Sequence, residues 1–390
     1  MSDQARPVPL RPEHFSGALR QAVRALDFAA TADAWQGAAP LGLHPGIDLA
    51  VVAFPPGGAP VWANVLFSPE QPGGVVAAIG TDAGPVQNIR FDRDQRDQRD
   101  AQGESMLWRP GADWSQNTFT PLWSRGAAHA TRFVAPYPAS LLKLMVAVGV
   151  GLAVDEGLCD WPEALAPMIT VSDNEATDRC VALLHRVGWL DSGPDNRPNR
   201  TNRPNRLNQH FSALGLHTLQ MHGTQPDGGW RNADGAGVGQ IHMTAWDTVR
   251  LLWLLDAEAP SPPWLPADTP PLLQPATRAQ LRTVLQAQQL NEVLSSNSLR
   301  GLPGWVPGGP DAPRFAHKTG TTDNYASDAG IVRALPDGRG HCLVAVLSTL
   351  GRRYAPHERC ATTWRLPALG AAVQALVESL ICRHPVTQPR

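Results

Sequence analysis

Two lysines stand out in this chain because nearly every other basic side chain is an arginine. The sequence contains 31 arginines and only two lysines, Lys143 and Lys318. An arginine stays protonated in a protein, whereas burial and neighbouring charges can tune a lysine until it accepts a proton. The two lysines are therefore candidates for acid–base chemistry. The alternative is that they survive by chance in an arginine-rich composition.

Lys143 follows Ser140 by three positions in a segment, 140–154, that is apolar almost throughout and predicts a buried helix. Residues i and i+3 share one face of a helix, so the Ser140 hydroxyl and the Lys143 amine can meet. A serine hydroxyl needs a neighbouring base to become a good nucleophile, and burial lowers the pKa of a lysine. The pair can therefore support acyl transfer through Ser140. The alternative is a capping serine beside a lysine that extends out of a core helix.

A second polar motif, Ser172-Asp173-Asn174, lies in the sequence MITVSDNEATD. The Ser172 hydroxyl can relay a proton to a leaving nitrogen, and the Asn174 amide can hydrogen-bond a substrate amide. The alternative is a helix N-terminus, because Ser172 followed three residues later by Glu175 has the pattern of a capping box.

The third motif is Lys318-Thr319-Gly320-Thr321 in the sequence AHKTGTTDNYASDAGIV. A lysine and threonine hydroxyls on a strand can bind a substrate carboxylate, and Gly320 lets a substrate backbone approach closely. An ordinary edge strand is the alternative interpretation.

Each motif occurs once, in this order, and together they contain both lysines. Ser-x-x-Lys, Ser-Asp-Asn and Lys-Thr-Gly in one chain resemble the class A β-lactamases and the related penicillin-binding proteins. The segments GLPGWVP (301–307) and DAGIV (328–332) are similar to sequence segments of that family. The resemblance covers residues 138–182 and 242–382 well. It implies a serine hydrolase that forms an acyl-enzyme on Ser140 and cleaves an amide, β-lactam or ester bond of a small-molecule substrate.

The same resemblance implies a role for each motif residue. Lys143 assists Ser140 as the base, Ser172 passes the proton to the leaving nitrogen, and Asn174 holds the amide of the acyl side chain. The residues that hold the carboxylate are Lys318, Thr319 and Thr321. The oxyanion hole consists of the backbone N–H groups of Ser140 and Thr321, which are donors of the kind that acyl transfer requires.

The chain departs from the family at the step that follows acylation. Class A β-lactamases hold a hydrolytic water with a glutamate beyond the Ser-Asp-Asn motif, but no glutamate occurs here between Glu175 and Glu258. Only Asp227 and Asp234 lie near the corresponding loop. Two alternatives therefore stay open: a penicillin-binding protein that traps an acyl group without turnover, and a structural domain with a decayed site.

Strand patterns at both ends of the chain and helical patterns between them predict the fold. Their order indicates an α+β fold, with an antiparallel sheet built from both termini, flanked by helices, and an inserted all-helical subdomain. The predicted helices are 12–30, 140–154, 242–255, 276–294 and 367–381, and the predicted hairpins are 47–67 and 328–349.

The domain organisation follows from the same patterns. We expect residues 1–40 to form an N-terminal extension with the first helix, and residues 41–390 to form the hydrolase domain with its helical subdomain at about 138–300. Inserted loops are expected at about 70–135 and 191–208. The second of these carries two copies of Asn-Arg-Pro-Asn-Arg, whose prolines exclude a helix.

Composition excludes several classes of partner. A formal charge of −2 gives no reason to expect nucleic acid, and no apolar run is long enough to predict a membrane span. The first residues lack an apolar stretch, which favours a cytoplasmic location, or a periplasmic one if the start codon is mis-assigned.

Cysteines are widely spaced and histidines lack metal-ligand spacing, so we expect neither a metal nor a cofactor.

Overall fold

The protein is described by a computed structural model over residues 10–94, 119–122, 130–191, 205–230, 241–295, 315–333, 338–358 and 360–380. Its largest element is a six-stranded sheet in the order β11-β12-β13-β3-β4-β5, and every neighbouring pair is antiparallel. The pairing of β13 with β3 joins strands from the two ends of the chain, as predicted. The strands are β3 (Ile47–Ala53), β4 (Val61–Ser68), β5 (Gln71–Val76), β11 (Phe315–Thr321), β12 (Ala326–Val332) and β13 (Cys342–Ser348).

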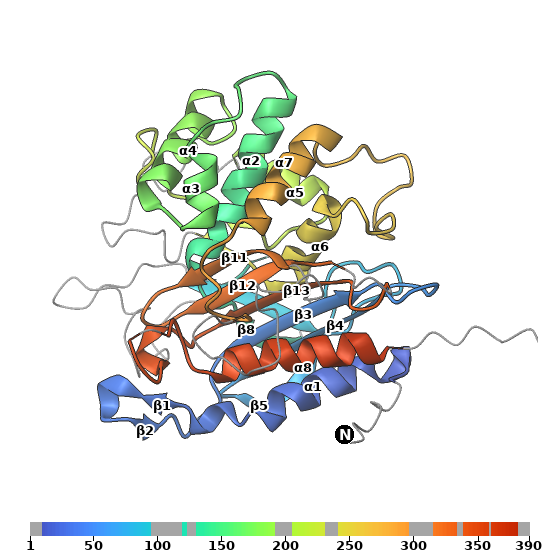
Figure 1. Ribbon diagram of the computed structural model, residues 1–390, viewed down its shortest axis with the longest axis vertical. Helices are drawn as coiled ribbons and strands as arrows, with labels where there is room; N and C mark the ends of the chain where they lie inside the picture. The colour runs from blue at the N-terminus through green and yellow to red at the C-terminus, as the bar shows by residue number, and fades with distance from the viewer. Residues whose placement is uncertain are drawn as a thin grey trace, which may run out of the picture.

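The sheet separates two hydrophobic cores. Strand β3 illustrates this, because Ala50 and Val52 belong to one core whereas Leu49 and Val51 belong to the other, as the alternation of side chains along a strand requires. The terminal helices α1 (Phe15–Ala25) and α8 (Arg365–Ser379) cover one face of the sheet, and the helical subdomain lies on the opposite side (Figure 1). The predicted α+β architecture is therefore confirmed.

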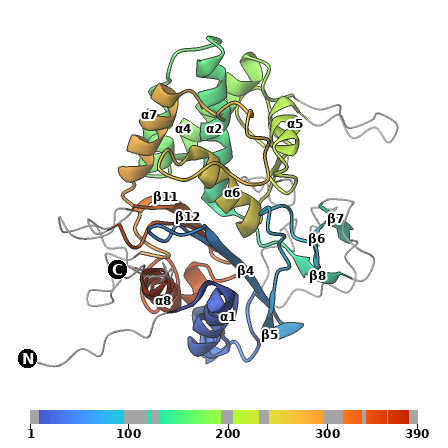
Figure 2. The ribbon, with the colours of Figure 1, turned by 90° about the vertical axis from the view of Figure 1, so that its right-hand side faces the viewer.

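The helical subdomain lies between β8 and β11 in the chain and forms the upper part of the molecule in Figure 2. Its apolar segment 140–154 becomes a short 3-10 turn, η6 (Ala139–Leu142), followed directly by the buried helix α2. The helices are α2 (Lys143–Asp155), α3 (Leu165–Thr170), α4 (Asn174–Arg186), α5 (Arg206–Ala213), α6 (Ala245–Leu255) and α7 (Pro275–Gln286).

Helix α7 ends earlier than the predicted segment 276–294. Beyond Gln286 the chain forms hydrogen bonds with the end of α3, and the helix does not continue. The Gln289 N–H donates to Thr170 O over 2.9 Å, and Gln288 Nε2 donates to Ile169 O over 2.8 Å. Helical periodicity continues in the sequence, but these tertiary bonds end the helix.

The segment 70–135 was expected as an inserted loop, and its described parts contain strands. Strand β5 extends the main sheet, and β6, β7 and β8 form a small separate sheet. Gly73 and Gly74 weaken the strand pattern of β5, and Gly74 has a φ of 75°. A Cβ on Gly74 would lie 2.3 Å from the ring of Phe67, so the glycine makes room for that side chain. The small sheet consists of β6 (Ile89–Asp94), β7 (Phe119–Pro121) and β8 (Thr131–Val134).

Short strand pairs complete the described structure, and the expected loop at 191–208 lies mostly outside it. The pairs are β1 (Ala32–Asp33) with β2 (Ala39–Pro40), and β9 (Gln220–Met221) with β10 (Ile241–His242). Within the described ranges, none of the helices is both long enough and apolar enough to cross a membrane.

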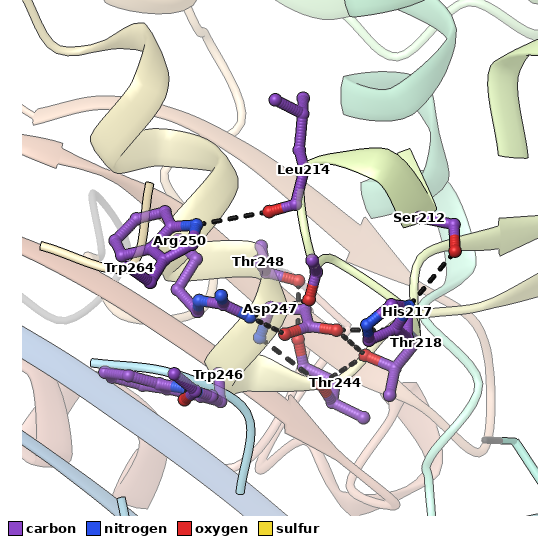
Figure 3. A network of polar contacts seen from close by, with 12 residues as sticks. Ser212, Leu214, His217, Thr218, Thr244, Trp246, Asp247, Thr248, Arg250 and Trp264 are labelled. Carbon is purple, nitrogen blue, oxygen red and sulfur yellow. Dashed lines mark hydrogen bonds and ion pairs between the residues drawn. The ribbon is translucent and has the colours of Figure 1, made fainter. Parts of the chain in front are cut away.

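A buried polar network holds the first turn of α6 in place (Figure 3). The Asp247 carboxylate accepts hydrogen bonds from Thr218 N at 2.9 Å and from Thr218 Oγ1 at 2.7 Å, and it pairs with Arg250 at 3.0 Å. On the side of the sheet, Asp48 of β3 accepts a hydrogen bond from Ala245 N at 2.8 Å. The Ala245–Asp48 hydrogen bond attaches the start of α6 to the sheet. Loss of either Asp247 or Arg250 would leave the other charge buried and uncompensated.

Candidate active site

Ser140 lies in the 3-10 turn η6, at the point where the chain enters α2. Side chains at i and i+3 eclipse each other in a 3-10 turn, so Ser140 and Lys143 still share one face. The preceding residue, Ala139, has a φ of 49°, a conformation that costs energy for a residue with a Cβ and that clusters at functional sites. The Ser140 side chain is half-buried.

The amine of Lys143 is directed into the protein interior, toward the Ser-Asp-Asn motif. The side chain is 2% exposed, and Nζ donates to Ser172 O at 2.6 Å, to Ser172 Oγ at 3.1 Å and to Asn174 Oδ1 at 2.8 Å. These contacts rule out a lysine that merely extends from a core helix toward water. Among the described residues its hydrogen bonds go to the Ser-Asp-Asn motif, and none joins it to Ser140.

Ser172 does not cap helix α4. The N-cap of this helix is Asp173, whose Oδ1 accepts from Ala176 N at 2.8 Å. Ser172 has a φ of 59°, and its hydroxyl oxygen accepts hydrogen bonds from Lys143 Nζ at 3.1 Å and Lys318 Nζ at 3.0 Å. One serine hydroxyl therefore lies between the two lysines of the chain.

Strand β11 is an edge strand of the main sheet and carries the third motif next to Ser140. Lys318 is completely buried, and its Nζ also donates to Thr319 O at 2.7 Å. A Cβ on Gly320 would lie 2.4 Å from Pro138 O and 2.6 Å from Leu141 N. Gly320 is thus required by the close approach of β11 to the turn that holds Ser140. The sequence had suggested only an approach by substrate.

The threonines of β11 differ in their surroundings. Thr319 is 2% exposed, whereas Thr321 at the end of the strand is half-buried. The Thr321 Oγ1 atom is nevertheless buried and has no hydrogen-bond partner among the described residues. Buried polar atoms without a partner are uncommon, so this hydroxyl is suited to bind a substrate group.

Burial lowers the pKa of both lysines, and the charge of Lys143 lowers the pKa of Lys318 further. Burial lowers the pKa of Lys143 to about 8, while the negative charges of Asp173 and Asp178 act in the opposite direction. The pKa of Lys318 is lowered well below its usual value, first by complete burial and second by the positive charge of Lys143. Neutral lysine is thus accessible near neutral pH, as a proton acceptor requires.

A buried hydrogen-bond network links β11 to β12 and to the segment after α7. The sequence did not reveal this network. His317 Nδ1 lies 2.8 Å from Asp328 Oδ1, and His317 Nε2 lies 3.2 Å from Asn291 Oδ1. Asp328 also accepts from Leu294 N at 3.0 Å. The sequence signal was a histidine directly before Lys318 and an aspartate in the next strand. Only the antiparallel pairing of β11 with β12 shows that they meet.

The carboxylates near the loop beyond α4 differ in their positions. Asp227 is exposed and accepts a hydrogen bond from Gly229 N at 2.9 Å. Asp234 lies outside the described residues. Asp178, which the sequence reading missed, lies in α4 four residues after Asn174 and interacts electrostatically with Lys143. Its position four residues after Asn174 was the available sequence signal, because it places both residues on one face of the helix.

The pKa of Lys143 gives a testable pH dependence. If neutral Lys143 is the base, the acylation rate should increase tenfold per pH unit below about 8 and level off above it. The amine itself can be followed by NMR after ¹³C-lysine labelling, because the chain has only two lysines and Lys318→Arg assigns the remaining signal. A Lys143 signal that titrates near the ordinary lysine value of about 10.4 would contradict this tuning.

The sheet built from both ends of the chain, the helical subdomain and the lysine-bearing edge strand define a β-lactamase-like protein. A sequence model described as the β-lactamase enzyme family matches residues 159–362, which is more than half of the chain. The chain belongs to this family.

Comparison with solved structures finds several similar chains. One is PBP-A, at 16% identity and a TM-score of 0.45, with 95% of this chain and 97% of that chain covered. Another is a β-lactamase from Burkholderia phymatum, at 13% identity and a TM-score of 0.46, with 94% and 99% covered. A β-lactamase from Chitinophaga pinensis has 16% identity and a TM-score of 0.45, with 92% and 97% covered. The search of curated proteins finds no match.

Proposed function

We propose that this protein is a serine hydrolase that forms an acyl-enzyme on Ser140 and cleaves an amide, β-lactam or ester bond of a small molecule. The observation that carries the proposal is the Ser172 hydroxyl, which lies within hydrogen-bond distance of both lysine amines. A cap or a surface loop has no need of two buried lysines around one hydroxyl. Amines around a hydroxyl can pass protons to it and take protons from it, as activation of a nearby nucleophile needs.

Acylation begins with neutral Lys143. Its amine accepts the proton of the Ser140 hydroxyl while the serine oxygen attacks the carbonyl carbon of the substrate. The negative charge that develops on the carbonyl oxygen is stabilised by the backbone N–H groups of Ser140 and Thr321. The packing of Gly320 against Pro138 and Leu141 brings the end of β11 to the nucleophile turn, which supports this pairing.

The leaving nitrogen takes its proton from Ser172. The Ser172 oxygen already accepts bonds from both lysines, so its own hydrogen points away from them toward the substrate. Protonated Lys143 then returns a proton to Ser172. The net result is an acyl ester on Ser140, a protonated leaving amine and a neutral Lys143.

Substrate binding uses the groups around the two lysines. A substrate carboxylate near Lys318 favours the protonated amine and offsets the depression of its pKa. Thr319 and the partnerless Thr321 hydroxyl complete this anion site. Asn174 turns its Oδ1 to Lys143, which directs the other end of the amide toward an acyl side chain.

A second candidate function is acyl trapping without turnover. It is favoured by the absence of glutamate from 176 to 257 and by the exposed position of Asp227. Water that attacks an ester needs a base within hydrogen-bond reach. If only a weak base lies within reach of that water, hydrolysis of the ester is slow and the acyl-enzyme is long-lived.

Rapid mixing with a chromogenic cephalosporin separates these functions. We expect a burst of product equal to the enzyme concentration, followed by slow steady-state turnover, because acylation outruns deacylation. A burst with no later turnover would establish trapping. No reaction with this probe, with penicillin G or with a small activated ester would contradict the proposed function. Fast turnover without a burst would show that deacylation does not limit the rate.

A further inference from the structure

Helix α4 carries an acidic residue, Asp178, one turn beyond the residue that contacts Lys143. Asn174 and Asp178 are four residues apart in this helix, so their side chains lie on one face. The Asn174 Oδ1 atom accepts from Lys143 Nζ at 2.8 Å, so this face is directed toward Lys143. Asp178 therefore lies one helical turn from a direct contact of the catalytic lysine.

A loop packs over the same part of α4. Gly228 has a φ of 99°, and a Cβ on it would lie 2.1 Å from Asp178 O. One end of the loop is fixed by the contact of Thr224 Oγ1 with His185 Nε2 at 2.9 Å, and Thr224 forms a β-bridge with Trp230. The loop from Thr224 to Trp230 thus packs against the backbone of Asp178, and Asp178 is half-buried.

Burial and the neighbouring acidic residues raise the pKa of the Asp178 carboxyl. Burial is the largest effect and raises its pKa, the positive charge of Lys143 opposes this, and Asp227, Glu175 and Asp173 raise the pKa further. Within the described structure no group donates a hydrogen bond to its carboxylate. Among the described residues, neither carboxylate oxygen is committed to a hydrogen bond or an ion pair.

The neighbouring carboxylates are already engaged. Asp173 caps α4 through Ala176 N, and Asp227 accepts from Gly229 N. Glu175 is exposed and lies 4.0 Å from Arg179, an ion pair on the surface of the helix. Among the acidic residues that influence Asp178, none combines partial burial, an uncommitted carboxylate and electrostatic coupling to Lys143 as Asp178 does.

We propose that Asp178 activates the water that hydrolyses the acyl-enzyme. This inference rests on the proposed function, since it needs an ester on Ser140. The Asp178 carboxylate takes one proton from water as the water oxygen bonds to the ester carbon. The tetrahedral intermediate then breaks its bond to Ser140 Oγ, and neutral Lys143 passes the proton on, accepting it from Asp178 and giving one to Ser140 Oγ, so Lys143 ends neutral as it began. The products are a free acid and the serine hydroxyl.

The test compares the formation and decay of the penicillin G adduct by intact-mass spectrometry. In Asp178→Asn, adduct formation should stay within about threefold of wild type, because acylation uses Lys143. Decay should slow by about 10²- to 10⁴-fold, the range typical of a lost general base. Asp178→Glu should restore part of the decay rate. Glu175→Gln is the matched control, because it removes one negative charge from the same helix at an exposed position, and its decay rate should match wild type.

Each outcome bears on the inference in a different way. An unchanged decay rate in Asp178→Asn, or slow decay in Asp227→Asn instead, would overturn the role of Asp178 and leave Ser140 acylation intact. A wild-type adduct that never decays would also reject a working base at Asp178. No adduct in the wild type would reject the proposed function itself. Circular dichroism and thermal melting check that the near-isosteric asparagine variant is folded.

Discussion

Ser140→Ala should abolish both adduct formation and turnover. Removal of a catalytic nucleophile typically costs several orders of magnitude, and here we expect a loss of at least about 10⁴-fold for any substrate that the wild type cleaves. The fold should be unaffected, because Ser140 is half-buried and alanine fits the 3-10 turn that already contains Ala139. Steady-state kinetics and intact-mass spectrometry measure the two effects.

Ser212→Ala is the matched control for this variant. Ser212 is an exposed serine of α5, away from the motifs, so its loss should change neither acylation nor turnover. Retained activity in Ser140→Ala, with the Ser212→Ala control behaving as wild type, would remove Ser140 from the mechanism.

The two lysines should respond differently to arginine. Lys143→Arg should reduce the acylation rate by about 10²- to 10⁴-fold, nearly as much as Lys143→Ala, because arginine keeps the charge but cannot accept a proton. Lys318→Arg should cost less, about 10- to 100-fold, because a carboxylate needs charge and donors, each charged hydrogen bond contributing about 1.5 to 3 kcal/mol. Stopped-flow acylation rates measure this difference.

The alanine variants calibrate the comparison. Lys318→Ala should be clearly worse than Lys318→Arg, whereas the two substitutions at Lys143 should be similar. Equal tolerance of arginine at both positions would show that Lys143 is not a base. Thermal melting of each variant separates these effects from loss of the fold, since both lysines are buried.

Local patterns in the sequence were sufficient for much of the fold. The β-branched runs around a Pro-Gly break predicted β3 and β4, and the apolar run after Ser140 predicted α2. Strand β5 was missed because its glycines serve a tertiary need, which is space for Phe67. The end of α7 was misplaced because bonds to α3 stop it. Periodicity describes an element, but it does not show where contacts with the rest of the chain end that element.

The motifs of the candidate site could be found from residue types and spacing, but the contacts within it could not. The sequence allowed Ser172 to be a helix cap, and the structure assigns that task to Asp173. Asp178 and His317 were missed because only the fold brings them to their partners, Lys143 and Asp328 respectively. Helix spacing reveals which residues share a face, whereas it does not show which buried partner lies opposite that face.

The most direct test of an acyl-enzyme on Ser140 is to locate the adduct in the chain. The protein is mixed with penicillin G, quenched in acid and digested with trypsin, which cuts after Arg132 and Lys143 and releases residues 133–143. Ser140 is the sole serine in this peptide. We predict that the mass of penicillin is added to this peptide and that fragmentation places it on Ser140. A modified peptide elsewhere, with 133–143 unmodified, would contradict the proposed mechanism.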